Sequence, residues 1–116
     1  MFPSLPGEES SLWLYSSMAK YFSHWLPASA RQMMATAGYF SYKVRPGLTI
    51  ISLNSNFCNN LNLWLLPSPR DPTSQLVWLY HQLREAEMSG VKAHIITHIP
   101  PGSSNCLSKW WLMTRD

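Results

Sequence analysis

Charged side chains are scarce in this sequence. Asp, Glu, Lys and Arg make up 13% of the 116 residues, about half the share usual in globular domains, whereas 46% are hydrophobic and 13% aromatic. A chain of this length can form one domain that buries roughly two-thirds of its unfolded surface. The composition leaves two interpretations open: an aromatic-rich core, or part of a larger body whose remainder covers the apolar surface.

Further absences narrow the class of protein. The nine Lys and Arg residues give a net charge of +3 but form no run, which argues against a nucleic-acid partner. No stretch reaches the about 20 consecutive apolar residues of a transmembrane segment, and residues 1–9 lack the basic and apolar regions of a signal peptide. The two cysteines, Cys58 and Cys106, are as consistent with one disulfide as with two reduced core thiols.

Metal ligands and nucleophile motifs are also few. A two-metal hydrolytic site needs several Asp, His and Asn side chains that converge from different strand ends. The sequence has only two aspartates, Asp71 and Asp116, and contains no Asp-x-His, Gly-Asn-His-Glu or Gly-His-x-His motif. No elbow motif surrounds a serine, and neither cysteine has an adjacent base, so nucleophilic catalysis is unsupported as well.

Hydrophobic spacing in the first half of the chain predicts helices followed by strands. Large apolar groups recur at three- and four-residue steps up to Pro27, and alternating and β-branched runs follow on either side of a Pro-Gly turn. The second of these runs is nearly all apolar, which is typical of a central strand covered on both faces. The predicted elements are a helix over 12–26, a short helical segment over 29–36, and a hairpin of strands 39–44 and 48–54.

A β-α-β unit is predicted in the second half. Asp71 and Pro72 are expected to cap and open a helix whose regular part spans 75–89, and a strand over 92–97 follows it. The crossover has the expected length, so this strand and strand 48–54 are expected to be parallel neighbours in an α/β fold. The helix is expected to bury Leu76, Leu79, Tyr80 and Leu83 and to leave Gln82, Arg84, Glu85 and Glu87 in solvent.

The end of strand 92–97 carries the most informative residue. His98 follows the β-branched run and precedes Ile99-Pro100-Pro101-Gly102, a layout that places reactive groups at the carboxyl edge of an α/β sheet. Asn54 and Asn56 end the neighbouring strand, so we expect them beside His98 as a possible rim of a site. The other histidines are poorer candidates: His24 on a helix face, His81 in solvent, and His94 buried within the strand.

A series of sequence blocks spans nearly the whole chain. In order, they are Trp13-Leu14-Tyr15-x-x-Met18-Ala19-Lys20, Gly38-Tyr39-Phe40, Pro46-Gly47-Leu48, Ile51-Ser52-Leu53-Asn54-Ser55-Asn56-Phe57-Cys58, Asn62-Leu63-Trp64-Leu65-Leu66, Asp71-Pro72, Gln75-Leu76-x-Trp78-Leu79 and His94-Ile95-Ile96-Thr97-His98-Ile99-Pro100-Pro101-Gly102. This order closely resembles the acid sphingomyelinase family, within the calcineurin-like metallophosphoesterase superfamily. Single blocks carry no weight, but chance does not explain so many in the same order.

The resemblance carries expectations about activity and site. Members of the family are secreted or lysosomal phosphodiesterases with paired sheets flanked by helices, and they use two zinc ions to hydrolyse sphingomyelin to ceramide and phosphocholine. By the same matching, His98 is a zinc ligand, and Cys58 and Cys106 form a disulfide that braces the loop carrying it. Two departures from the family are Thr97, where Gly is usual, and the longer approach to Cys106 through residues 103–105.

The resemblance also implies an incomplete active site. The chain corresponds to the stretch between the family's Gly-Asn-His-Glu and Gly-His-x-His blocks, so residues 1–116 are expected to form part of a metallophosphoesterase sandwich that lacks the other zinc ligands. With one histidine, zinc binding should be weak and the chain alone inactive. Two alternatives stay open: a short non-catalytic module that binds a partner or lipid surface through exposed aromatics, and an active small hydrolase.

Overall fold

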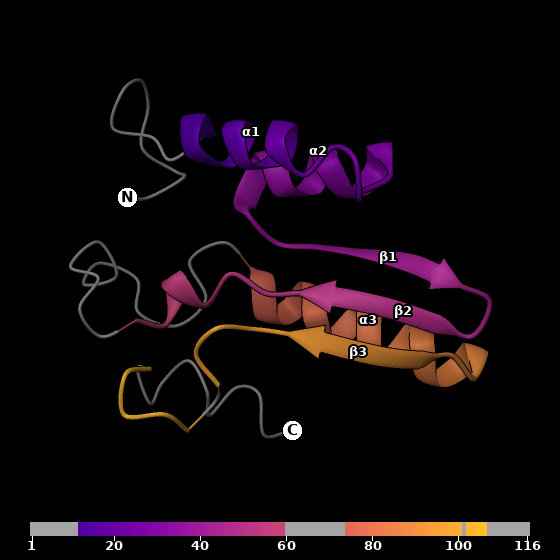
Figure 1. Cartoon of the computed structure of the whole chain (residues 1–116). Coiled ribbons are helices and arrows are strands. Elements are labelled where there is room, and N and C mark those ends of the chain that lie inside the picture. Colours follow the sequence, from indigo (N-terminus) through magenta and orange to yellow (C-terminus); the bar gives the residue numbers. More distant parts are fainter. Residues whose placement is uncertain (1–11, 60–73, 101, 107–116) are drawn as a thin grey trace.

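The computed structural model describes residues 12–59, 74–100 and 102–106, which form a small α/β fold (Figure 1). The α/β class predicted from the hydrophobic pattern is confirmed. None of the described helices is long and apolar enough to cross a membrane. The elements, in chain order, are α1 (Leu12–Tyr21), α2 (Ala28–Ala37), β1 (Phe40–Arg45), β2 (Leu48–Ser52), the 3₁₀ turn η2 (Ser55–Phe57), α3 (Gln75–Ser89) and β3 (Lys92–Ile96).

The described strands form one mixed sheet in the order β1-β2-β3. β1 and β2 are antiparallel, and the turn between them places Gly47 at φ 86, a conformation that glycine adopts without strain. β2 and β3 are parallel, with Ser52 opposite Ile96. The predicted hairpin and parallel pairing are therefore confirmed, although β2 and β3 end at Ser52 and Ile96, slightly before the predicted ends.

Helix α3 packs on one face of the sheet and has the predicted bounds. Leu76 and Leu79 from this helix join the fully buried Ile51 of β2 in one core cluster. The helix ends at Gly90, whose φ of 68 is a left-handed cap that satisfies the last carbonyl groups. Ser74 occupies the N-cap without a side-chain hydrogen bond. The predicted roles of Asp71 and Pro72 lie outside the described residues.

The face of α3 that contacts the sheet is rotated from the predicted one. Tyr80 and Leu83, expected in the core, are exposed, whereas Gln82, expected in solvent, is half-buried and accepts a 2.8 Å hydrogen bond from the hydroxyl of Ser41. The ring of Trp78 lies 4.7 Å from that of Tyr39, just before β1. These contacts with β1 and with the residue before it determine which face of α3 meets the sheet. The spacing of apolar residues along the helix does not predict them.

Helix α1 is shorter than the predicted helix over 12–26. It ends at Tyr21, and three-residue turns follow, in which Trp25 N–H donates to the carbonyl of Phe22 at 3.1 Å. Pro27 disfavours helical geometry at the residue before it, so the chain tightens and reverses. The reversal buries Leu26 in a cluster with Ala19, Ala30, Met34 and Phe40, and α2 then spans the predicted helical segment.

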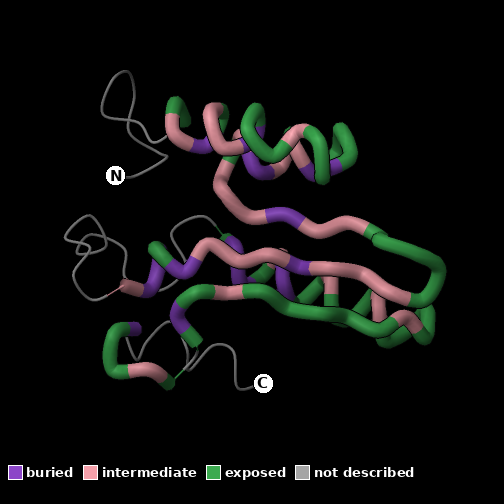
Figure 2. Tube along the Cα trace, in the orientation of Figure 1, coloured by how far each residue is buried: buried purple, intermediate pink, exposed green. Residues whose placement is uncertain are grey.

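Burial is uneven across the sheet (Figure 2). β2 is the central strand as predicted, but only Ile51 in it is fully buried; the prediction of cover on both faces is wrong for its other residues, which are half-buried. All five residues of β3 are exposed. His94 is therefore exposed rather than buried, and it lies on the edge strand of the described sheet.

Candidate functional site at the carboxyl ends of β2 and β3

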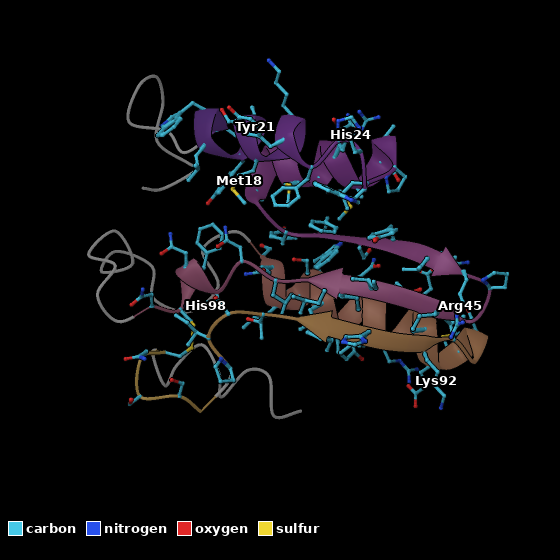
Figure 3. All side chains as sticks on the ribbon, viewed as in Figure 1. Met18, Tyr21, His24, Arg45, Lys92 and His98 are labelled. Carbon is cyan, nitrogen blue, oxygen red and sulfur yellow. A yellow bond between two sulfur atoms is a disulfide. The ribbon has the colours of Figure 1, made fainter. Side chains whose placement is uncertain are left out.

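The two parallel strands end at the same edge of the sheet. Ser52 and Ile96 are paired, and Leu53 N–H then donates to the carbonyl of Ile96 at 2.9 Å, so the chains leave the sheet side by side. Beyond this point β2 continues into Asn54 and η2, and β3 continues into His98. Figure 3 places His98 past the end of β3, beside the η2 segment. This edge is where α/β proteins bind ligands.

A pocket of about 420 Å³ lies at this edge, between the sheet and the α1–α2 layer. Its volume is within the range of small-molecule sites. Asn54, Asn56 and His98, the three residues expected at one edge, all line it. Met18 also lines it, and Figure 3 shows this side chain directed from α1 toward the sheet, whereas Tyr21 points away. The fold thus brings the candidate residues together in one concave site.

The side chain of Asn54 makes hydrogen bonds that join neighbouring elements of the fold. Its Nδ2 donates to the hydroxyl of Tyr15 at 3.0 Å and to the carbonyl of Ala37 at 3.2 Å, and its Oδ1 accepts from the backbone N–H of Asn56 at 3.2 Å. These bonds join α1, the end of α2 and the turn after β2. Asn54 is therefore a rim residue by position, but its side chain serves as a junction rather than as a free ligand.

Gln75 is a site-supporting residue that the sequence pattern does not reveal. Its side chain is fully buried at the start of α3, where Oε1 accepts from Asn54 N–H at 2.6 Å and Nε2 donates to the Asn54 carbonyl at 3.0 Å. The amide thus satisfies both backbone groups of Asn54 in place of a neighbouring strand. A polar residue in the first turn of a helix is ordinarily exposed, so its burial is not expected from the pattern. The only sequence signal for a special role of this residue is its place in the block Gln75-Leu76-x-Trp78.

The loop that carries the exposed imidazole of His98 is held by hydrogen bonds of the residues on both sides of it. Ile99 is buried, and its N–H donates to the hydroxyl of the buried Ser55 at 3.2 Å across 44 residues of sequence. The half-buried Thr97 uses its hydroxyl to donate to the carbonyl of Ile99 at 3.3 Å, so the departure from glycine here adds a local hydrogen bond. His98 itself is exposed and lines the pocket.

A disulfide closes the base of the loop. Cys58, directly after η2, is bonded to Cys106, with a Cα–Cα distance of 4.8 Å, and Asn59 forms an isolated β-bridge with Cys106. Both cysteines are buried in the core cluster that contains Ile99. The pairing that the resemblance implies is present in the structure, and it ties the segment after His98 to the segment after β2.

The described residues do not fit a complete zinc site. No group of three or more His, Cys, Asp or Glu side chains converges within residues 12–59, 74–100 and 102–106. His24 is exposed after α1, His81 is exposed on α3 as expected, and His94 is exposed on β3, so none of them joins His98 in lining the pocket. The described residues that line the pocket offer one imidazole, which is fewer donors than a catalytic zinc ion needs from a protein.

Gly38 allows the close approach on which the pocket depends. It ends α2 at φ 78, and an added Cβ would lie 2.7 Å from Asn54 Nδ2 and 2.9 Å from Tyr15 Cε1. We expect Gly38→Ala to lower the free energy of unfolding by about 3 kcal/mol, from left-handed strain and steric overlap. Gly90→Ala is the matched control, because Gly90 also caps a helix at positive φ but faces open space; it should cost about 1 kcal/mol.

The measurement for this pair is urea unfolding followed by circular dichroism. Equal losses for the two variants would contradict the proposed crowding at Gly38, because both share the backbone strain and only Gly38 has neighbours within contact distance.

Comparisons with known proteins agree with the motifs at this edge. No family profile matches the chain. The sphingomyelin phosphodiesterases of Bos taurus and Homo sapiens are each 48% identical over 108 residues, which is 93% of this chain and 17% of theirs. A more distant relative, the cyclic GMP-AMP phosphodiesterase of Mus musculus, is 36% identical over 91 residues, which is 77% of this chain and 20% of its own.

The length relation limits what is shared. The chain spans about 17% of the length of the two sphingomyelin phosphodiesterases, so the similarity concerns one stretch of a larger protein. Over 93% of its length the chain is therefore homologous to one stretch of the sphingomyelin phosphodiesterases.

Proposed function

We propose that this chain forms part of the catalytic domain of a zinc-dependent phosphodiesterase that hydrolyses sphingomyelin to ceramide and phosphocholine. The names of the relatives and their 48% identity support the substrate. Residues 1–116 would supply one hairpin and one β-α-β unit of a metallophosphoesterase sandwich, and the rest of that fold would come from outside this chain. The chain alone is inactive in this proposal.

The observation that carries the proposal is the placement of His98. An exposed imidazole lines a pocket at the carboxyl ends of parallel strands, on a loop held by the Ser55 hydrogen bond and the disulfide. Holding an imidazole in place in this way is what a metal ligand requires, since ligands fixed by neighbouring groups bind more tightly. His98 is proposed as one ligand of a two-zinc centre, and the remaining ligands are proposed to lie outside this chain.

The proposed setting is a lysosomal or extracellular one. The Cys58–Cys106 disulfide supports it, because disulfides persist in oxidising compartments and are rare in the cytosol. The proposed substrate is a membrane lipid, which the protein would reach from the lumen or the cell exterior.

The test compares this chain with a longer protein that contains it and the missing ligand blocks. Release of phosphocholine from sphingomyelin is measured with added zinc. We expect hydrolysis by the longer protein and background rates for the chain alone. Failure of the longer protein to hydrolyse sphingomyelin would refute the proposed substrate, and hydrolysis by the chain alone would refute its inactivity.

A pair of histidine variants of the longer protein tests the ligand. His98→Ala is expected to lower the zinc content of the purified protein together with its activity. His81→Ala is the matched control, because His81 is exposed on α3 and does not line the pocket. Unchanged zinc content in His98→Ala would rule out His98 as a ligand.

A further inference from the structure

The backbone of Asn54 is held by Gln75, a residue that does not itself line the pocket. The buried Gln75 amide accepts from Asn54 N–H at 2.6 Å and donates to the Asn54 carbonyl at 3.0 Å, and Phe57 N–H adds a longer bond of 3.4 Å to that carbonyl. The two Asn54 groups belong to the peptide units on either side of its Cα atom, and each peptide unit is planar and stiff. Gln75 therefore helps to set the direction in which the chain continues into Ser55.

Ser55 joins this turn to the loop after β3. Its hydroxyl oxygen accepts from Ile99 N–H at 3.2 Å, and that N–H belongs to the peptide unit between His98 and Ile99. Ser55 and Ile99 are 5% and 9% exposed, so water has little access to replace the bond. Figure 3 shows His98 beside η2, the turn that begins at Ser55. The bond thus holds the peptide unit that directly follows His98.

We infer that Gln75 and Ser55 are positioning residues for His98 in the proposed reaction, and that Gln75 acts through Ser55. The inference rests on the proposed function, because that function gives His98 its role. The Gln75 amide is bonded to Asn54 at both ends, and the Ser55 oxygen is bonded to Ile99, so both side chains are engaged with the backbone. Two successive peptide units transmit the position of the first turn of α3 to the edge of the pocket.

The exposure of His98 is the reason that such support matters. An exposed imidazole has no close packing of its own to fix it, so buried contacts can hold only the backbone that carries it. A reacting group that is misplaced by about 1 Å can lower a rate by about a hundredfold. Holding the backbone beside His98 therefore preserves the geometry on which the rate depends.

Turnover by the longer protein tests the role of Ser55. Ser55→Ala is expected to lower kcat by about tenfold or more and to change KM by less than about twofold, because the lost bond is to the backbone. Ser55→Thr keeps the hydroxyl and should restore most of the turnover. Ser41→Ala is the matched control, because the Ser41 hydroxyl bonds to Gln82 and does not line this pocket. Full turnover in Ser55→Ala, or a change in KM alone, would refute the assignment.

A double variant tests the path from Gln75. Gln75→Leu alone should also lower kcat. When it is combined with Ser55→Ala, the turnover should stay within about twofold of that of Ser55→Ala, because residues that act through one contact are not additive. Combined with Ser41→Ala, the two effects should multiply. Full turnover in Gln75→Leu, or losses that multiply for Gln75 and Ser55, would refute the path.

NMR relaxation of this chain, with no substrate present, gives a readout that does not depend on activity. The backbone amides of His98 and Ile99 should have order parameters as high as that of Ile51 in β2, near the value of about 0.85 for rigid backbone. The order parameter of His98 should fall in Ser55→Ala and stay unchanged in Ser41→Ala. A clearly lower value at His98 than at Ile51 in the unaltered chain would refute the inference, even where a variant does not fold.

The two arms separate this inference from the proposed function. A longer protein that hydrolyses sphingomyelin at full rate with Ser55→Ala would refute only the positioning role. A longer protein without activity, together with an ordered His98 that loosens in Ser55→Ala, would refute only the proposed reaction.

Discussion

Reduction of the Cys58–Cys106 disulfide is expected to lower the free energy of unfolding by about 4 kcal/mol. The bridge joins cysteines 48 residues apart, so it restricts a long loop in the unfolded chain, and the chain-entropy relation for a loop of this length corresponds to about 4 kcal/mol. Both cysteines are buried in the cluster that contains Ile99. Most of that packing remains after reduction, so the loss comes mainly from the unfolded state.

Urea unfolding of the oxidised and reduced protein measures this change. The loop carrying His98 lies between β3 and Cys106, so amide exchange at Ile99 should accelerate on reduction more than exchange at Ile51. A Cys58→Ala, Cys106→Ala double variant should behave like the reduced protein with a small additional loss from the missing sulfur atoms. Two free thiols in the native protein, measured by mass under non-reducing conditions, would contradict the bridge itself.

Replacing Gln75 by leucine should also lower the free energy of unfolding substantially. Gln75→Leu keeps the approximate volume of a fully buried side chain but removes the two hydrogen bonds that the Gln75 amide makes with Asn54 N–H and with the Asn54 carbonyl. Asn54 N–H loses its partner, which costs about 1–3 kcal/mol, whereas the Asn54 carbonyl still accepts from Phe57 N–H at 3.4 Å, so we expect a loss of about 3 kcal/mol. The turn after β2, which carries Asn54 at the rim of the pocket, would loosen with it.

Gln82→Leu is the matched control for this prediction. It changes the same residue type on the same helix, but Gln82 is half-buried and its partner, the Ser41 hydroxyl, can turn to water. The expected loss is at most about 1 kcal/mol, measured by urea unfolding beside Gln75→Leu. Similar losses in the two variants would show that the Asn54 contacts contribute little.

A charged variant separates the two hydrogen bonds. In Gln75→Glu the carboxyl can donate to the Asn54 carbonyl only when it is protonated. Burial and that carbonyl both disfavour the ionised form, so its pKa in the folded state is expected to lie above the unfolded value. The stability of this variant should therefore rise as the pH falls and be lost as the pH increases. A variant equally stable at pH 4 and pH 8 would contradict the bond to the carbonyl.

Local sequence signals predict the β-α-β unit well. These signals are the β-branched runs, the crossover length and the helix over 75–89, and each depends on residues close together in the chain. The structure contains the predicted helix and the predicted parallel strands. The predictions fail where distant contacts decide. Gln82 is half-buried because it meets Ser41, and the chain after Tyr21 packs Leu26 into one cluster with Phe40 of β1.

The candidate site shows the same division. His98 and Asn54 stand at predictable strand ends, and parallel pairing brings those ends to one edge. The supporting residues are unpredictable from the pattern, because Gln75 and Ser55 are ordinary polar residues whose importance comes from partners 21 and 44 positions away. Their burial and their bonds exist only once α3 and the loop after β3 have packed against the turn after β2.

The sequence by itself determined the α/β class, the parallel pair of strands and the position of His98 at their shared edge, because periodicity and turn residues act locally. Only the tertiary structure decided that Asn54 is a structural junction, that β3 and His94 are exposed, and that Gln75 is buried against the turn after β2. Those properties depend on which surfaces meet, and surfaces far apart in the chain meet only after folding.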